Sequence, residues 1–254
     1  MEAKRAGGVV CAALFGLLSL ACGSPSTGNR VSGDSHFERA LLFPLNVVVA
    51  MPGELEAGAG RVDEALRGYL AERGRSVETL PYSEARSAWI ESVKACMAAA
   101  AQGCKGFDGA GSLLAQRLAD GREFDALIIP YLTMRPARMQ LRSVKWDGVS
   151  RTLETVGEFQ RSGDVELMNS FNGTTQAPSL AVFVFSHQGR KMFQGVGGLD
   201  LAHRVRIEPG KVTIADTRWN FELVQDVFSD PEHLREGVAI AFYPLLAKEE
   251  PEAR

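Results

Sequence analysis

Two apolar stretches constrain the fold most, because each has the pattern of a β-strand covered on both faces. Residues 41–50 read Leu-Leu-Phe-Pro-Leu-Asn-Val-Val-Val-Ala, and residues 125–132 read Asp-Ala-Leu-Ile-Ile-Pro-Tyr-Leu. Near-continuous apolar runs of this length are typical of strands buried between layers of helices. Pro44 has no N–H to donate, so we expect it at a bulge or at the start of its strand. The sequence therefore favours an α/β fold.

Three helical patterns lie between these two strands. Apolar residues recur with the helical period over residues 62–70, and Gly74 ends the pattern. A short strand is expected at residues 76–81, followed by a helix over residues 83–101 with Ser83 as its N-cap. The predicted buried residues of this helix are Trp89, Ile90, Val93 and Met97. A third, short helix is predicted over residues 108–118, with Asp108 as its cap.

The second half of the chain changes to short alternating segments separated by turn residues, which indicates a β-meander. The predicted strands are residues 139–145, 150–159, 164–169, 180–186, 191–196 and 211–216. The predicted turns are Asp147-Gly148, residues 161–163, Asn172-Gly173 and residues 187–190. A last helix begins at Asp230 as cap and Pro231 as first residue. Its predicted apolar stripe is Leu234, Val238, Ala241, Phe242 and Leu245.

This order of elements, βαβαα followed by a β-meander and a C-terminal helix, predicts one α/β domain over residues 39–247. We expect its sheet to be mixed, parallel in the first half and meandering later. Residues 248–254 form a polar tail.

The N-terminus has the pattern of a secretory signal peptide over residues 1–21. Lys4 and Arg5 precede an apolar run of roughly a dozen residues, whereas a membrane span needs about 20. The Leu-Ser-Leu-Ala-Cys ending resembles a bacterial lipoprotein signal, which implies that Cys22 is acylated and becomes the first residue of the mature protein. A plain secretory signal with an incidental cysteine, or an uncleaved anchor, remains open. Residues 22–38 are polar and turn-rich, which predicts a flexible tether.

Cys96 and Cys104 are the two cysteines of the exported domain, and an oxidising compartment favours a disulfide between them. On one continuous helix their Cα atoms would lie about 12 Å apart, which exceeds the limit of ~7 Å for a disulfide. The helix must therefore end between them, and Gln102-Gly103 is the expected place.

Composition and motifs argue against several classes of function. A net charge of −3 at pH 7 gives no overall field that would attract nucleic acid. The four histidines (His36, His187, His203 and His233) show no metal-ligand spacing. Residues 109–113 lack the last glycine of G-x-S-x-G, and Gly58-Ala59-Gly60 lacks the third glycine of a dinucleotide-binding turn. We expect no metal, no cofactor, no nucleic-acid partner and no catalysis.

Two further clusters invite an interpretation. Arg135, Arg138, Arg142 and Lys145 crowd one stretch, and Arg138 and Arg142 would share a strand face with Gln140. They form a candidate surface for an acidic partner, an anionic headgroup or cell-wall carboxylates, the alternative being a solvated strand edge kept soluble by its charge. The glycines of residues 195–198 indicate a strand bend or bulge.

The order of elements also carries a family likeness. The features are a lipid-attachment Cys22, a polar tether, a Leu-Phe-Pro-Leu-Asn strand, an Ile-Ile-Pro-Tyr strand, a late hairpin over residues 181–196 and a closing helix. In that order they resemble small bacterial envelope lipoproteins such as the penicillin-binding-protein activators and the curli-export lipoproteins. The resemblance implies a non-enzymatic α/β domain, anchored in the membrane of the cell envelope by its lipid and facing the periplasm or the cell surface. It also implies an envelope protein or cell-wall partner. An envelope hydrolase, a purely structural lipoprotein and a subunit of an oligomeric export assembly remain alternatives.

Overall fold

The structure is a computed structural model that describes residues 29–31, 36–140, 142–156, 172–206, 220–224 and 226–247. The predicted signal peptide, Cys22, the strands expected at residues 164–169 and 211–216, the turn at 161–163 and the polar tail lie outside the described residues.

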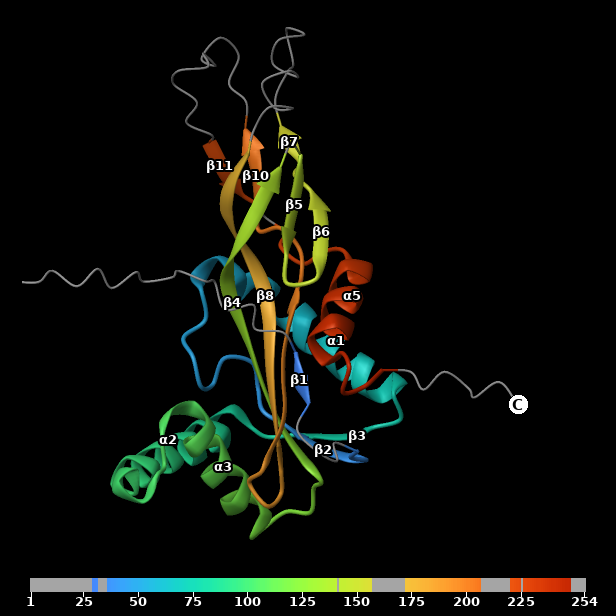
Figure 1. The fold of residues 1–254 in the computed structure, drawn as a ribbon. Helices are drawn as coiled ribbons and strands as arrows, with labels where there is room; N and C mark the ends of the chain where they lie inside the picture. The colour runs from blue at the N-terminus through green and yellow to red at the C-terminus, as the bar shows by residue number, and fades with distance from the viewer. Residues whose placement is uncertain are drawn as a thin grey trace, which may run out of the picture.

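An eight-stranded mixed sheet forms the centre of the molecule (Figure 1). Six strands follow one another in the order β1 (Arg30–Val31), β9 (Lys191–Gly198), β8 (Asn172–Ser186), β4 (Ala126–Gln140), β2 (Arg39–Leu42) and β3 (Ser76–Thr79). The remaining two, β5 (Ser143–Trp146) and β6 (Val149–Thr152), continue from β4 as an antiparallel meander. Strand β2 runs parallel to β3 and β4, whereas β8, β9 and β1 are antiparallel to their neighbours. The predicted α/β class with a mixed sheet is confirmed.

Helices cover both faces of this sheet. Alternate residues of β4 point to opposite sides: Ala126 and Ile128 pack in one core with α1 (Ala59–Glu72) and α5 (Pro231–Phe242). Leu127 and Ile129 pack in another core with α2 (Tyr82–Ala98) and α3 (Gly106–Ala119). The short 3-10 turns η1 (Gly53–Gly58) and η2 (Ala100–Gln102) precede α1 and follow α2. The apolar run of β4 is thus explained by burial on both faces.

The pair β4–β8 extends beyond the helices and carries a third core. The two strands, 15 residues each, pair along their whole length from Ala126 opposite Ser186 to Gln140 opposite Asn172. At the far end, Met139 and Trp146 pack with Val205 of a second, three-stranded sheet. That sheet has the order β11 (Asn220–Leu223), β10 (His203–Arg206) and β7 (Thr155–Val156) (Figure 1). The prediction that Asn172-Gly173 starts a turn is wrong, because both residues lie inside β8.

The first predicted strand ends earlier than expected, and Asn46 gives the physical reason. Strand β2 stops at Leu42, and Asn46 adopts a left-handed φ of 57°. Its side-chain oxygen accepts a hydrogen bond from Leu132 N at 2.8 Å, and its side-chain nitrogen donates to Leu132 O at 2.9 Å. The side-chain amide of Asn46 therefore pairs with the backbone N–H and C=O of Leu132 in β4, which a neighbouring strand would otherwise have to do.

The first and last helices match the sequence pattern. In α1, Val62, Leu66 and Leu70 are buried, and Gly74 follows with a φ of 70°. In α5, the Asp230 carboxylate accepts hydrogen bonds from Glu232 N at 2.8 Å and His233 N at 3.2 Å. Pro231 takes the first helical position as predicted.

The second helix differs in its cap and in its buried face. Helix α2 begins at Tyr82 after Pro81, and no side chain caps it, so the prediction for Ser83 is wrong. Its buried residues are Ala85, Ser92 and Cys96, whereas Ile90 and Met97 are exposed. Small residues let α2 lie close to its neighbours. Of the predicted set, Trp89 is partly buried against the same core, whereas Ile90 and Met97 remain outside.

The predicted disulfide is present. Cys96 and Cys104 are bonded, and their Cα atoms lie 5.3 Å apart. The α-helix ends at Ala98, and Gly103 adopts a left-handed φ of 98° after the 3-10 turn, in the place expected for the helix stop.

No bulge falls at the glycines of residues 195–198, since they pair in continuous register inside β9 and the register shift falls at Val184/Phe185. Their role is to admit α5. A Cβ atom on Gly195 would overlap the carbonyl oxygen of Ala241, and one on Gly197 would overlap that of Gly237. The helix backbone therefore lies directly against the strand backbone.

The folded domain begins before residue 39, which corrects the predicted tether. The side chain of Asn29 donates to Ile240 O and to Tyr243 O, both at 2.6 Å, and accepts from Val196 N at 2.9 Å. Strand β1 pairs with β9, and Phe37 is fully buried in the core that α1 and α5 cover. The sequence did not indicate that these few residues pack against the domain, because the segment around them is polar.

Candidate functional site

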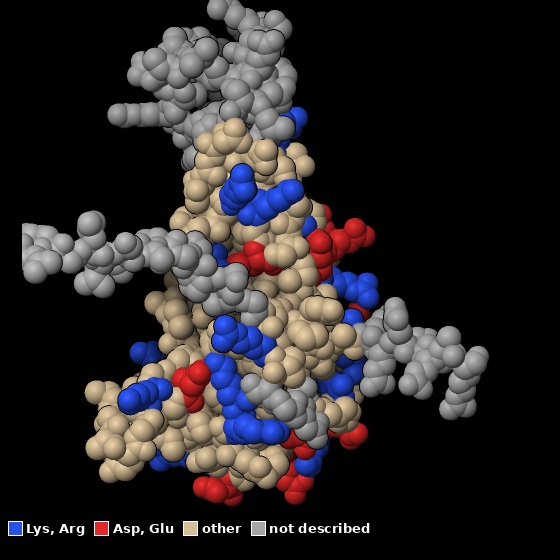
Figure 2. Space-filling model, viewed as in Figure 1, with Lys and Arg blue, Asp and Glu red and all other residues tan. Residues whose placement is uncertain are grey.

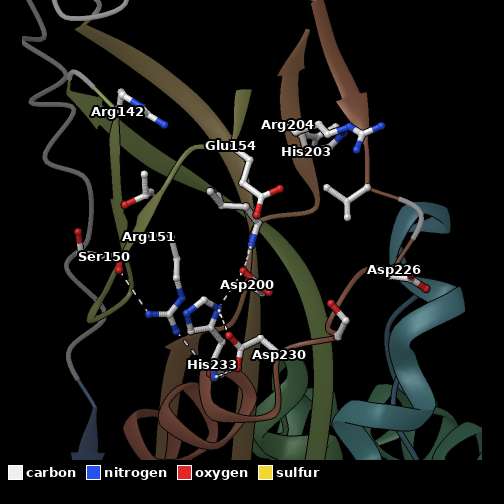
Figure 3. Close-up of a pocket in the computed structure, with 14 residues that line it drawn as sticks. Arg142, Ser150, Arg151, Glu154, Asp200, His203, Arg204, Asp226, Asp230 and His233 are labelled. Carbon is white, nitrogen blue, oxygen red and sulfur yellow. Dashed lines mark hydrogen bonds and ion pairs between the residues drawn. The ribbon is translucent and has the colours of Figure 1, made fainter. Parts of the chain in front are cut away.

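A cavity of about 680 Å³ lies between β6, β10 and the N-terminal end of α5 (Figure 3). Its lining is dominated by charged and polar side chains. The ionisable ones are Arg142, Arg151, Glu154, Asp200, His203, Arg204, Asp226, Asp230 and His233. Three hydroxyl residues, Ser150, Thr152 and Ser229, also line it.

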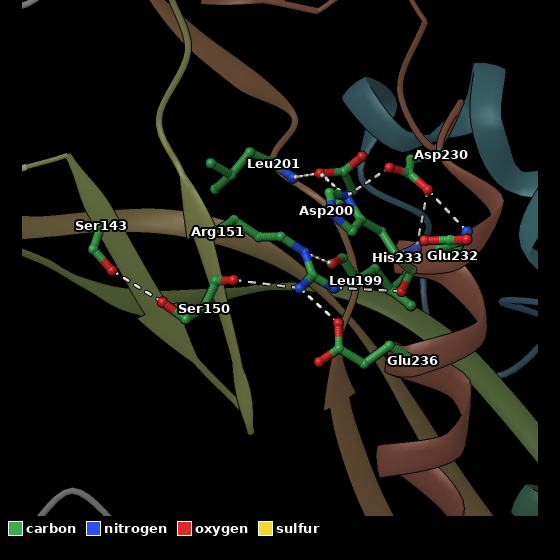
Figure 4. Close-up of polar contacts among 10 residues, drawn as sticks. All are labelled: Ser143, Ser150, Arg151, Leu199, Asp200, Leu201, Asp230, Glu232, His233 and Glu236. Atoms are coloured by element: carbon green, nitrogen blue, oxygen red, sulfur yellow. Dashed lines mark hydrogen bonds and ion pairs between the residues drawn. The ribbon is translucent and has the colours of Figure 1, made fainter.

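Arg151 holds the walls of the cavity together. Its side chain is buried, and its Nε donates to Leu199 O at 3.1 Å. One terminal nitrogen donates to Glu236 Oε2 at 2.7 Å, and the other donates to His233 O at 3.4 Å (Figure 4). Because a buried guanidinium needs partners for its donors, these bonds fix β6 against the β9–β10 connection and α5.

His233 lies between two carboxylates in the first turn of α5. Its Nδ1 atom is 3.2 Å from Asp200 Oδ1 and 3.6 Å from Asp230 Oδ2 (Figure 4). Hydrogen bonds from the backbone N–H groups of His233 and Glu232 hold the pKa of Asp230 below its usual range. The two carboxylates thus lie at ion-pair distance from the imidazole at the cavity wall, but neither makes a hydrogen bond with its Nδ1 atom.

The hydroxyl groups of the cavity are placed less suitably for catalysis. Ser150 Oγ lies 2.9 Å from Ser143 Oγ across the β5–β6 pair (Figure 4). Within the described residues, the Nδ1 atom of His233 contacts two carboxylates, and it contacts no serine or threonine hydroxyl. The arrangement places an imidazole beside two carboxylates, without a hydroxyl nucleophile in contact with its Nδ1 atom among the described residues.

The cavity has a mixed electrostatic character. Arg204 Nε is 3.6 Å from Glu222 Oε2, and the two residues are cross-strand partners in the β10–β11 pair. Arg142, Glu154 and Arg204 lie around the end of the cavity opposite His233 (Figure 3). A polar ligand that carries charge of both signs would match this lining better than an apolar one. Among the described residues, no three His, Cys, Asp or Glu side chains are grouped so that they could hold a metal ion.

The four basic residues singled out in the sequence are divided among three places. Arg135 Nε lies 2.7 Å from Asp147 Oδ2, which also accepts from Ser179 Oγ at 2.7 Å, so Arg135 stabilises the β5–β6 turn. Arg142 follows β4 and lines the cavity, which means that it does not share the strand face of Arg138 and Gln140 as predicted.

Arg138 and Lys145 remain as a pair at the surface. They are cross-strand partners in β4 and β5, and both side chains are exposed. Their outer neighbours in the same row are Thr174 of β8 and Ser150 of β6, so the row Thr174–Arg138–Lys145–Ser150 contains two cations and no acid. Basic side chains gather over the upper part of β4 and β5 (Figure 2). We call these four residues the basic row.

A second, apolar groove of about 520 Å³ lies beside the disulfide on the other side of the molecule. Trp89, Met97 and Phe107 line it, together with the two cysteines. Met97 is 73% exposed.

The sequence did not reveal the contacts of Arg151, or that of His233 with Asp200, because these partners are distant along the chain. Arg151 and Glu236 are 85 residues apart, and only the fold joins them. The one local signal was the cap at Asp230, which placed His233 in the first turn of a helix.

No helix within the described parts of the chain has both the length and the apolar character that a membrane crossing requires. Comparison with known proteins gave no match: no family model, no curated protein and no solved structure is significantly similar to this chain.

Proposed function

We propose that this protein is a lipid-anchored lipoprotein of the bacterial cell envelope that binds an acidic envelope partner and has no catalytic activity of its own. Two arguments support export. The first 21 residues have the pattern of a signal ending at Cys22, and the domain contains the Cys96–Cys104 disulfide, a bond that persists in oxidising compartments.

The basic row is the observation that carries the binding proposal. Like charges directly opposite each other in a sheet are destabilising, and neither cross-strand neighbour of Arg138 and Lys145 is an acid. The cross-strand neighbours of this pair therefore leave its two charges unneutralised. A partner that presents carboxylates to the row would neutralise both cations at once.

The partner surface can be tested by photo-crosslinking in cells. A photo-reactive residue in place of Gln140, an exposed neighbour of the row, should give an adduct with an envelope protein. The double substitution Arg138→Glu with Lys145→Glu should abolish that adduct. The matched control is Lys94→Glu with Lys105→Glu, which reverses two exposed cations at the other face and should leave it unchanged. An adduct that survives charge reversal of the row contradicts the proposal.

The anchor is tested by cell fractionation. Cys22→Ser should release the domain from the membrane fraction, because this substitution removes the sulfur that the proposal acylates. Cys11→Ser, which changes a cysteine inside the signal, should leave it membrane-bound. Retention of the Cys22→Ser protein in membranes would rule out lipidation as the anchor.

An envelope hydrolase is the second candidate, and the Asp200–His233–Asp230 contacts inside the cavity favour it. The two functions differ in one measurement. If the purified protein hydrolyses a cell-wall or ester substrate, and if His233→Gln abolishes the activity while His203→Gln preserves it, the cavity is an active site. The binding proposal expects no activity above the rate of the His233→Gln variant.

A further inference from the structure

We propose that the domain turns the surface formed by β1 and the C-terminal end of α5 toward the lipid bilayer, so that the polar cavity at the other end of α5 lies farther from it. The inference depends on the proposed acylation of Cys22. It assigns a membrane-facing surface to the domain, centred on Val31 and Tyr243.

The point where the chain leaves the domain toward Cys22 is fixed. The side chain of Asn29 bonds to the backbone at Ile240, Tyr243 and Val196, and the next two residues pair with β9. The last carbonyl groups of a helix lack intrahelical donors, so the amide of Asn29 also satisfies the end of α5. The chain therefore emerges at the C-terminal end of α5.

The distance from this point to the membrane has an upper limit set by covalent geometry. Six residues lie between Cys22 and Asn29, so the two are seven Cα–Cα steps apart, and a fully extended chain of seven steps spans about 25 Å at most. With the acyl chains of Cys22 in the bilayer, Asn29 lies within about 25 Å of the membrane surface whatever path the intervening residues take.

The side chains around this exit suit the interface between lipid and water. Tyr243 is 63% exposed, and its carbonyl oxygen accepts the hydrogen bond from Asn29. Val31 is 38% exposed. Tyrosine is enriched at this interface because its ring is apolar and its hydroxyl remains hydrated. The exposed Arg30 stands between Asn29 and Val31 and would be attracted to anionic headgroups.

The alternative surface is the apolar groove beside the disulfide, with Met97 at its rim. It belongs to α2 and α3, which cover the opposite face of the sheet from α1 and α5. One flat bilayer cannot contact both surfaces, and the chain leaves the domain at Asn29 on the α5 side, which favours that side.

The position of the cavity follows from the length of α5. Asp230 and His233 form the cavity wall at the start of this helix, whereas Asn29 holds its end. Helix α5 has 12 residues and is about 18 Å long. The cavity wall at its N-terminal end therefore lies about 18 Å from the end that Asn29 contacts.

Fluorescence quenching by brominated lipids tests the orientation. The full-length protein, with acylation of Cys22 verified by mass spectrometry, is placed in vesicles of phosphatidylcholine and phosphatidylglycerol with brominated chains. Tyr243→Trp and Met97→Trp are compared with the parent, which has three tryptophans of its own. We expect the added emission of the Tyr243→Trp protein to be quenched and that of Met97→Trp to persist. Adding Asn29→Ala to Tyr243→Trp should reduce the quenching, because the exit is no longer fixed.

Each other outcome overturns the inference. Quenching of Met97→Trp but not of Tyr243→Trp would assign the bilayer to the α2–α3 face. Equal quenching, or no quenching of either, in an acylated protein would remove the preferred orientation and leave the proposed function intact. An unmodified Cys22 would overturn the proposed function, and the orientation with it.

Discussion

At the scale of single residues, a few polar side chains replace backbone contacts that the strands cannot make for themselves. Asp125 is one of them. Its Oδ2 accepts hydrogen bonds from Arg39 N at 2.8 Å and Glu38 N at 3.1 Å, and its Oδ1 lies 3.3 Å from the Arg39 guanidinium. These contacts, the bond from Arg39 N first, hold the pKa of Asp125 below its usual range. Asp125 thereby joins the start of β2 to the start of β4.

Asp125 should therefore contribute to the loss of stability in acid. Its folded-state pKa is lower than its unfolded value of about 3.9, so its contribution is complete above that pH and disappears as pH falls through the lower, folded value. We expect Asp125→Asn to destabilise the protein at pH 7 and to make little difference at pH 2. Urea denaturation at both pH values checks this. An equal loss at both would mean that the carboxylate charge is unimportant.

At the scale of elements, the contact between α5 and β9 depends on the absence of side chains at Gly197 and Gly237. A Cβ atom at either position would overlap a backbone carbonyl of the other element. The helix holds one wall of the cavity, so the glycines determine how near that wall lies to the sheet.

Gly197→Ala should force α5 away from β9. We expect a loss of about 1–3 kcal/mol in the free energy of unfolding, the usual cost of overpacking, measured by urea denaturation. Gly68→Ala is the matched control, since this exposed glycine of α1 has open space around it. The control should stabilise the protein by about 0.5–1 kcal/mol, because alanine is the better helix former. A neutral Gly197→Ala would show that the helix can shift without cost.

The same scale shows what the sequence could predict. The apolar periods of α1 and α5, the cap at Asp230 and the helix stop at Gly103 are local signals, and the structure bears them out. The predicted buried face of α2 was wrong in part: its fully buried residues are small, Trp89 is partly buried against the core, and Met97 is exposed. The predicted end of the first strand was wrong because the side-chain amide of Asn46 bonds to Leu132, 86 residues away. Long-range partners of this kind leave no trace in a local pattern.

At the scale of the whole molecule, three features lie at separate places. The exit at Asn29 lies at one end of α5, the cavity at the other, and the apolar groove on the opposite face of the sheet. Of the predicted basic residues, only Arg138 and Lys145 form a common surface, since Arg135 pairs with Asp147 of the β5–β6 turn and Arg142 lies after β4 and lines the cavity. The cavity could not be predicted, because it combines residues from β6, β10 and α5.

The hydrogen bonds of Asn29 also determine how the domain responds to mechanical force. A pull on the N-terminal segment is transmitted first to this one side chain and then to β1, a two-residue strand at the edge of the sheet. Load applied at an edge detaches bonds one after another, whereas β4 and β8 in the centre are held along 15 residues each. Under tension, Asn29 and β1 should therefore detach from the sheet first, while the β4–β8 pair keeps its structure.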